Sequence, residues 1–282
     1  MSKNYLSIYA KSFNWAGFFL PKKIYQKCSA LYDFCRKIDN IADDDGDINT
    51  KKNKLLSFKS NFINKNYDNP IIKNMWELIN NYEISEKIIN DLFDGVESDL
   101  NKQVKINSKK DLLIYSYRVA GTVGLMMAKI LNVKKQSALR AAIDLGIAMQ
   151  LTNISRDVIE DSKKNRYYID HNFETIKETL KIADQFYESS FSSIKDIPFS
   201  CRFSILVARR VYKKIGDKIL DKKNIENYNN SGKIYVSNTG KIVQTILSFF
   251  DLIKLFLIKS EVHLREKEHM LINEDINLNE RI

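Results

Sequence analysis

The sequence predicts an all-α protein, and three observations support this prediction. Only nine glycines and three prolines interrupt the 282 residues, too few turn-forming residues for a β-sandwich, a barrel or a series of βαβ units. Apolar residues recur at intervals of three and four along most of the chain, which is the period of a helix. A hydrophobic content of 44% is enough to fill a core. We therefore expect a single domain over residues 1–282, built as a helical bundle.

The first half of the chain predicts a series of amphipathic helices. After a short N-terminal segment, Pro21 suits the first turn of a helix, and apolar residues follow at helical period until the turn at Asp45-Gly46. Further helices are expected over 51–65, 70–82 and 85–101, each with one apolar face and one face rich in Lys, Asn and Glu.

The second half contains the most apolar helices. The segments 108–131 and 138–159 are apolar on most sides and are expected at the centre of the fold. Amphipathic helices over 172–195 and 199–222 follow, then a polar linker over 225–238 and a last helix from about Thr239. The segment 241–260 is the most apolar and predicts a buried core helix. The alternative is a helix that lies on a membrane surface, where a net charge of +10 would favour anionic lipid.

Charge and cysteine usage exclude several classes of protein. The basic residues are spread along the chain without a recognition motif, so we expect no nucleic-acid partner. Cys28 and Cys35 lie about 10 Å apart along one predicted helix and cannot pair, and the three histidines offer no zinc spacing. Residues 1–10 are too short and polar for a signal peptide, and no apolar run could span a bilayer. These features predict a cytoplasmic protein.

The first of two acidic clusters is YDFCRKIDNIADDDGD, where Asp39 and Asp43 stand four residues apart on one helical face. Like charges at this spacing repel each other and call for a cation. A solvated acidic helix end is the simpler interpretation. A calcium loop is excluded, because alignment on its invariant glycine puts Ile41 at the first ligand position and Lys52 where a bidentate Glu is needed.

The second cluster is QLTNISRDVIEDSKKNRYY, where Gln150, Asn153, Asp157 and Asp161 form one polar stripe on an otherwise apolar helix. If the two helices face each other, four carboxylates converge on hard cations. Magnesium prefers a few carboxylates together with waters and substrate phosphates, so this arrangement favours a diphosphate ligand. Basic side chains beside the clusters, each also consistent with simple solvation, are available to phosphate: Arg36, Lys37, Arg156, Lys164 and Arg166.

Between the clusters, Gly121 and Gly124 interrupt the helical segment YSYRVAGTVGLMMAKIL. Two interpretations remain open: room for a ligand against the backbone, or close packing of two helices. Val123, Leu125 and the methionines at 126 and 127 supply apolar walls. Together with the acidic clusters they suggest a central apolar cavity with metal at one end, suited to a long hydrocarbon that carries a diphosphate.

These motifs resemble the head-to-head trans-isoprenyl diphosphate synthases, the squalene/phytoene synthase family. The resemblance rests on KSF at 11–13, YDFCRKIDNIAD at 32–43, YRVAGTVGLMM at 117–127 and QLTNISRDVIED at 150–161, with the pair Arg166 and Tyr168 and the later YVSNTGK. These segments span most of the chain in the family's order. The resemblance implies the all-α isoprenoid synthase fold. The chain departs from the family's pattern at Asn40, at Lys233, and at Tyr168-Ile169-Asp170.

The resemblance also implies a reaction. Two geranylgeranyl diphosphates would condense through a cyclopropylcarbinyl diphosphate to phytoene, in carotenoid biosynthesis, without NADPH. Mg²⁺, or alternatively Mn²⁺, would be held by Asp39, Asp43, Asn153, Asp157 and Asp161, and the four aspartates, Tyr32 and Arg36 would be catalytic. The implied substrate-binding residues are Ser12, Phe13, Tyr117, Gly121, Val123, Gln150, Asn153, Arg156, Arg166, Tyr168 and Tyr228.

Two other functions compete with this one. A sister enzyme would convert farnesyl diphosphate to dehydrosqualene or squalene, because the sequence does not measure the depth of the pocket. A non-catalytic relative would act as a binding protein, although such a protein is expected to lose metal ligands and all four aspartates are present. Because substrate and product of the family dissolve in membranes, we also expect weak peripheral association with the inner face of the membrane.

Overall fold

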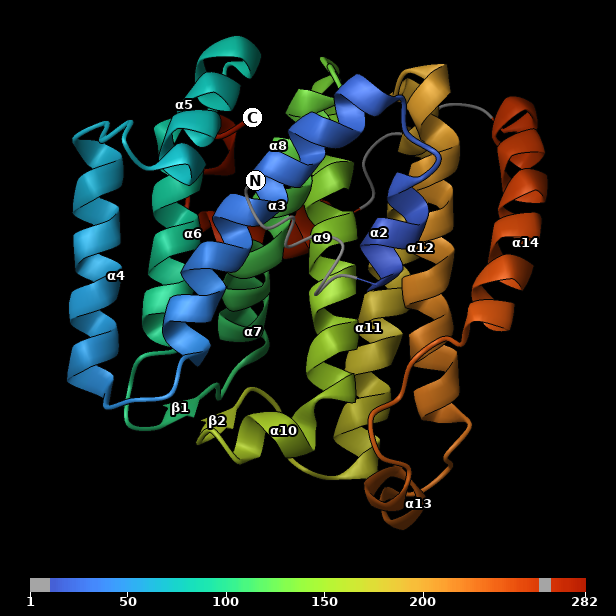
Figure 1. The fold of residues 1–282 in the computed structure, drawn as a ribbon. Coiled ribbons are helices and arrows are strands. Elements are labelled where there is room, and N and C mark those ends of the chain that lie inside the picture. Colours follow the sequence, from blue (N-terminus) through green and yellow to red (C-terminus); the bar gives the residue numbers. More distant parts are fainter. Residues whose placement is uncertain (1–10, 259–264) are drawn as a thin grey trace.

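The computed structural model describes residues 11–258 and 265–282, with side chains from Phe13 onward in the first range. It confirms the all-α prediction (Figure 1). In chain order the helices are α2 (Lys11–Gly17), α3 (Lys22–Asp43), α4 (Ile48–Ile63), α5 (Pro70–Tyr82), α6 (Glu86–Ser98), α7 (Lys109–Ser116), the π-helix η1 (Tyr117–Gly121), α8 (Thr122–Ile130), α9 (Gln136–Arg156), α10 (Val158–Ser162), α11 (Phe173–Phe191), the 3-10 helix η2 (Ser192–Asp196), α12 (Phe199–Leu220), α13 (Ile225–Asn230), α14 (Asn238–Leu257), α15 (Glu266–Asn273) and the 3-10 helix η3 (Leu278–Glu280).

Polar side chains fix where several of these helices begin. Asn69 immediately precedes Pro70, the first residue of α5, and its side chain accepts a hydrogen bond from the Ile71 amide. Asn172 and Ser237 cap α11 and α14 in the same way. Such caps satisfy amides that lack a partner in the first turn of a helix.

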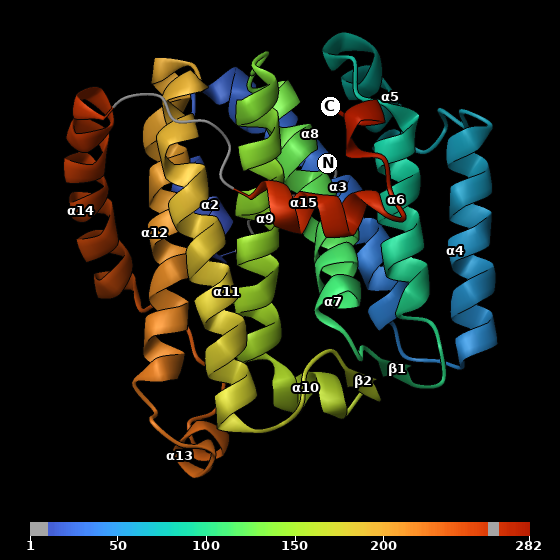
Figure 2. The ribbon, with the colours of Figure 1, turned by 180° about the vertical axis from the view of Figure 1, so that it is seen from behind.

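Helix α9 is central to the bundle and packs on α8, α11 and α12. Its residues Ile143, Ile147 and Leu151 are fully buried in the core that runs through most of the chain. Figures 1 and 2, which view the bundle from opposite sides, show α4 at one edge and α14 at the other. None of the helices in the described residues has the length and apolar content needed to cross a bilayer.

Glycines allow α9 to touch both η1 and α8 backbone to backbone. A Cβ at Gly124 would lie 2.2 Å from the carbonyl oxygen of Ala142, and a Cβ at Gly146 would lie 2.3 Å from the carbonyl oxygen of Ala120. No real Cβ atom approaches a backbone atom so closely. Of the two interpretations of the glycine pair, close helix packing therefore applies to Gly124. A Cβ at Gly121 would instead meet the side chains of Tyr117 and Ile143 at 3.0 and 3.2 Å.

Several elements differ from the sequence prediction. The helix expected over 108–131 is divided by η1, the helix expected over 138–159 is broken at Asp157, and the predicted linker contains α13. A two-residue parallel ladder pairs β1 (Val104–Lys105) with β2 (Arg166–Tyr167). These are short adjustments of backbone geometry that depend on distant partners, which periodicity does not report.

The prediction of a buried core helix over 241–260 is wrong for α14. Its buried residues include Lys241, Gln244, Ser248 and Asp251, whereas most of its large apolar side chains are exposed. The cause is polar anchoring to α12, described below.

Candidate functional site

Both acidic clusters lie at one end of the bundle, where α3 ends and α10 follows α9 (Figure 1). Direct contacts join them. Lys164, which follows the second cluster, places its Nζ 2.9 Å from Oδ1 of Asp43, and Arg166 Nη1 donates to the same oxygen at 2.9 Å. Arg166 Nη2 also donates to the Ala42 carbonyl at 3.3 Å. The segment after the second cluster thus holds the end of the first.

The second cluster contains a break between two helices. Asp157 has φ −105° and ψ 16°, outside the helical range, and separates α9 from α10. Helical hydrogen bonds nevertheless continue across it. The Asp157 amide donates to the backbone carbonyl oxygen of Asn153, and the Asp161 amide donates to that of Asp157. The predicted polar stripe therefore persists with a slight turn at Asp157.

Tyr228 supports this break from α13. It is 2% exposed, and its hydroxyl lies 3.0 Å from the Ser155 carbonyl oxygen and 2.9 Å from that of Arg156. These carbonyls belong to the last turn of α9, where intrahelical donors are missing. The structure thus gives Tyr228 a supporting position behind the acidic residues.

Basic side chains form ion pairs with two of the four aspartates, Asp157 and Asp43. Arg156 Nε donates to Asp157 Oδ1 at 2.8 Å while its Nη2 pairs with Oδ2, and Lys233 Nζ lies 3.5 Å from Oδ1. Burial alone would raise the pKa of Asp43, but Lys164 and Arg166 outweigh it and hold that pKa below its ordinary value. Basic side chains therefore balance the charge of Asp43 and Asp157.

The negative charges of the other two aspartates, Asp39 and Asp161, are only partly compensated by nearby cations. Burial raises the pKa of Asp39 to about 7, and the nearby charges of Asp43 and Asp99 add to the rise. Burial and the charge of Asp157 raise the pKa of Asp161 to about 7. Carboxylates with raised pKa values favour a bound proton or a bound cation. The site is short of positive charge at these two positions.

A fifth aspartate, Asp99, joins the site from the end of α6. Tyr168 donates to its Oδ1 at 2.7 Å, the Tyr115 hydroxyl lies 2.9 Å from its Oδ2, and the two tyrosine rings stack with centroids 4.5 Å apart. Burial raises the pKa of Asp99. Sequence reasoning missed Asp99 and Tyr115, because a single acid at a helix end carries no spacing signal. The β1–β2 ladder, which brings residues 104–105 beside 166–167, sets Tyr168 next to them.

The donor set fits a divalent cation held partly by substrate. Among the described residues, no three His, Cys, Asp or Glu side chains lie close enough to hold a metal ion by themselves. The side-chain oxygen of Asn153, however, is buried and has no hydrogen-bond partner, and it belongs to the predicted metal ligands. Carboxylate and amide oxygens are hard ligands, and Mg²⁺ usually keeps waters or substrate phosphates for its remaining positions.

Aromatic side chains lie on neighbouring helices. Phe13 of α2 packs against Tyr212 of α12, with ring centroids 5.1 Å apart, and Tyr212 was not among the sequence predictions. Burial raises the pKa of Tyr212 to about 12 and also raises that of Tyr32 above its ordinary value, so both phenols stay protonated. Tyr32 precedes Arg36 by one turn of α3, and both are half-buried. The side chain of Ser12 lies outside the described residues.

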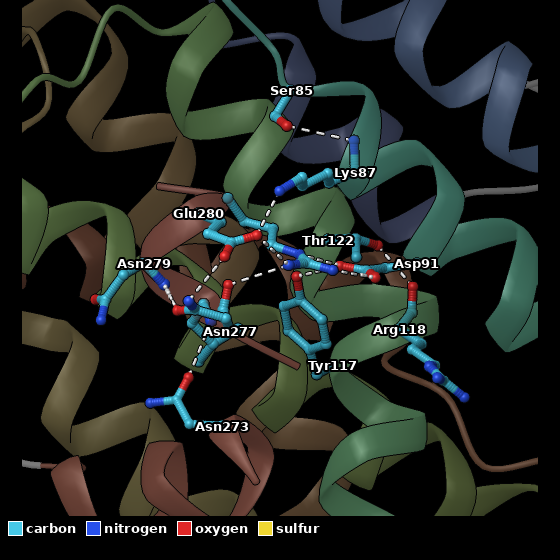
Figure 3. A network of polar contacts seen from close by, with 12 residues as sticks. Ser85, Lys87, Asp91, Tyr117, Arg118, Thr122, Asn273, Asn277, Asn279 and Glu280 are labelled. Atoms are coloured by element: carbon cyan, nitrogen blue, oxygen red, sulfur yellow. Dashed lines mark hydrogen bonds and ion pairs between the residues drawn. The ribbon is translucent and has the colours of Figure 1, made fainter. Parts of the chain in front are cut away.

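The remaining predicted residues range from half-buried to fully buried. Gln150 and Val123 are half-buried, Gly121 is buried, and Tyr117 is 0% exposed. The Tyr117 hydroxyl donates to Asp91 Oδ2 at 2.9 Å, within the network of Figure 3. Arg281 donates hydrogen bonds to the same carboxylate from Nε and Nη2, at 2.9 and 3.0 Å. The structure therefore places Tyr117 in the packed interior, tied to the C-terminal residues.

Comparisons with known proteins agree with this architecture. A family model described as squalene/phytoene synthase matches residues 7–171, more than half of the chain. The phytoene synthase of Pseudescherichia vulneris is 28% identical over 74% of this chain and 78% of that protein. The 15-cis-phytoene synthase of Pantoea ananas is 26% identical over 76% of this chain and 80% of that protein.

Solved structures of similar proteins share the fold. The crystal structure of a dehydrosqualene synthase in complex with ligand superposes with a TM-score of 0.74 at 26% identity and covers 89% of this chain and 94% of that one. A squalene synthase from Alicyclobacillus acidocaldarius has a TM-score of 0.66 at 16% identity, over 79% of this chain and 91% of that one.

Proposed function

Because the chain belongs to the squalene/phytoene synthase family, we propose that it condenses two geranylgeranyl diphosphates head to head to give phytoene. The single observation that carries this proposal is the junction of the two acidic motifs, in which Lys164 and Arg166 reach across to Asp43. A diphosphate bound between these motifs would meet carboxylates and cations from both sides. The similarity to several phytoene synthases supports this choice of substrate.

The proposed reaction balances without a reductant. The C–O bond of one allylic diphosphate breaks and its electron pair leaves with the diphosphate; the double bond of the second molecule then attacks the cation and a proton is lost, forming a cyclopropylcarbinyl diphosphate. A second departure of diphosphate, ring rearrangement and loss of another proton give phytoene. Two diphosphates and two protons are released, so NADPH has no part in the reaction.

Five side chains are proposed to hold Mg²⁺ or Mn²⁺: Asp39, Asp43, Asn153, Asp157 and Asp161. When bound, such an ion supplies Lewis-acid assistance to the departing diphosphate. The chain's own cations contribute as well. Arg156, Lys164 and Arg166 neutralise Asp157 and Asp43 in this structure, and these three side chains would be available to diphosphate oxygens if a bound ion balanced the two carboxylates.

Uncharged aromatic rings are suited to stabilise the carbocation that forms in the proposed reaction. Phe13, Tyr32 and Tyr212 present neutral rings, and a ring face attracts a nearby cation. Apolar surroundings also keep water from capturing the cation. We assign the reaction to the cytoplasm.

A second candidate is the condensation of farnesyl diphosphate to dehydrosqualene. It is favoured by the similarity to the dehydrosqualene synthase structure, which covers most of both chains. The two candidates share the acidic site and differ in the length of the hydrocarbon that the interior accepts.

Substitution of the aspartates tests the proposed site. Asp39→Asn and Asp157→Asn are each expected to lower product formation at least about a hundredfold in the presence of Mg²⁺, with an unchanged far-UV circular dichroism spectrum. Asp45→Asn is the matched control, because Asp45 is an exposed acid of the same run. Asp45→Asn should retain activity. An active Asp157→Asn enzyme would overturn the metal assignment.

A further inference from the structure

Helix α14 turns its polar side toward the bundle and its apolar side outward, the reverse of an ordinary surface helix. The residues that face the bundle are Lys241, Gln244, Ser248, Asp251 and Leu255, four of them polar. Asp251 accepts from Arg210 of α12 through both oxygens, at 2.5 and 2.8 Å, and Trp15 Nε1 donates to Thr245 Oγ1 at 3.0 Å. Polar contacts therefore fasten α14 to the protein.

The opposite side of α14 is apolar and exposed. At about 3.6 residues per turn, its apolar side chains cover half of the helix cylinder over roughly 24 Å. Their exposed fractions range from 36% at Leu247 to 81% at Leu257. We call this surface the α14 face; its residues are Ile242, Val243, Ile246, Leu247, Phe249, Phe250, Ile253, Phe256 and Leu257.

The α14 face extends onto α12 and stands at the rim of the molecule. Phe199, 62% exposed, packs beside Phe256 with ring centroids 6.2 Å apart. Figures 1 and 2 both show α14 at the outer edge of the bundle. Large contiguous apolar surface is unfavourable in water and usually marks an interaction site.

Positive charge borders the α14 face. A cavity of about 220 Å³ between α11, α12 and α14 is lined by five cationic side chains and only three anionic ones. The cationic side chains are Arg209, Arg210, Lys213, Lys214 and Lys254, and the anionic ones are Glu188, Asp217 and Asp251. Asp184 adds a fourth anionic group through its ion pair with Lys213, which leaves a surplus of one positive charge, and Lys254 of α14 itself is exposed. This surplus agrees in sign with the net charge of +10 of the whole chain.

We propose that the α14 face docks on an anionic lipid bilayer, with α14 lying in the plane of the interface. An apolar half-cylinder beside cationic side chains matches acyl chains below and lipid phosphates above. A second copy of the chain would cover the apolar residues, whereas an anionic bilayer covers them and also supplies negative charge to the cationic border. The inference goes beyond the proposed reaction and does not depend on it.

Vesicle flotation with the full chain tests this docking surface. The vesicles contain phosphatidylcholine with about one third phosphatidylglycerol, and the comparison vesicles contain phosphatidylcholine alone. We expect the wild type to bind the anionic vesicles at low ionic strength and to bind the neutral ones more weakly. Phe250→Ser/Phe256→Ser should lose affinity for anionic vesicles by about tenfold or more.

The matched control is Leu56→Ser/Ile63→Ser, which removes two apolar side chains of α4 that are 53% and 57% exposed. These residues lie at the opposite edge of the bundle, so vesicle affinity should stay within about twofold of wild type. Equal losses in both variants, or no binding by the wild type, would overturn the proposal. A wild-type dimer seen by light scattering without vesicle binding, and broken by Phe250→Ser/Phe256→Ser, would assign the α14 face to a second copy instead.

Discussion

Replacement of Gly146 by alanine tests the close crossing of η1 and α9. The added Cβ would lie 2.3 Å from the Ala120 carbonyl oxygen and 2.9 Å from the Gly121 Cα, and both of these are backbone atoms. Ordinary contacts of this kind need about 3.4 Å, so the two helices must separate by roughly 1 Å. Overpacking of a core costs about 1–3 kcal/mol, and rigid backbone on both sides favours the upper end.

The gain in helix propensity offsets part of this cost. Alanine is better than glycine in a helix by about 1 kcal/mol, which leaves a net loss of about 2 kcal/mol in the free energy of unfolding. An unfolding entropy near 2.1 cal/mol/K per residue converts this loss to a fall in Tm of roughly 3–4 °C for a chain of this length. Differential scanning calorimetry measures it directly.

Gly216→Ala is the matched control in α12. There the added Cβ would meet only the terminal Cδ2 atom of Leu180, at 3.3 Å, and a side-chain methyl can move. We expect Gly216→Ala to unfold at or slightly above the wild-type Tm, by up to about 1 kcal/mol of added stability. A Gly146→Ala variant that unfolds at the Gly216→Ala temperature would refute the claim that the helices touch backbone to backbone.

Three further predictions concern the ion pair of Arg281 with Asp91, the hydrogen bonds of Tyr228 to α9, and the divalent cations of the proposed reaction. Arg281→Ala should lower the free energy of unfolding in urea by about 2–4 kcal/mol, because it leaves the buried Asp91 without its bidentate partner. Adding Asp91→Asn should restore part of this loss, and an unchanged deficit would contradict the pairing. Tyr228→Phe should cost about 1 kcal/mol, measured in the same way, since two carbonyls of α9 lose their donor. Chelation of divalent cations should stop turnover reversibly, and full activity in excess chelator would exclude the metal assignment.

The acidic motifs were readable from the sequence because their chemistry is local. The i, i+4 pair at Asp39 and Asp43 and the stripe through Asn153 and Asp157 depend only on helix periodicity. Their junction was not readable, because it depends on ion pairs between residues 121 and 123 positions apart. Asp99 escaped prediction for the same reason: both tyrosines on its carboxylate arrive from distant elements.

Helix α14 shows where hydrophobic patterning misleads. Its high apolar content predicted burial, yet the 3-4-3 spacing of Lys241, Gln244, Ser248 and Asp251 already marked a polar stripe. Periodicity identifies two faces of a helix but does not say which one meets the protein. Arg210 of α12 decides the matter by pairing with Asp251, and this turns the apolar side outward.

Incubation of the purified protein with Mg²⁺ and either geranylgeranyl or farnesyl diphosphate, followed by identification of the hydrocarbon, tests the central claim most directly. The account predicts phytoene from geranylgeranyl diphosphate without NADPH. Dehydrosqualene from farnesyl diphosphate as the dominant product would move the chain to the second candidate. No hydrocarbon from either substrate would contradict the proposed condensation and favour a binding protein.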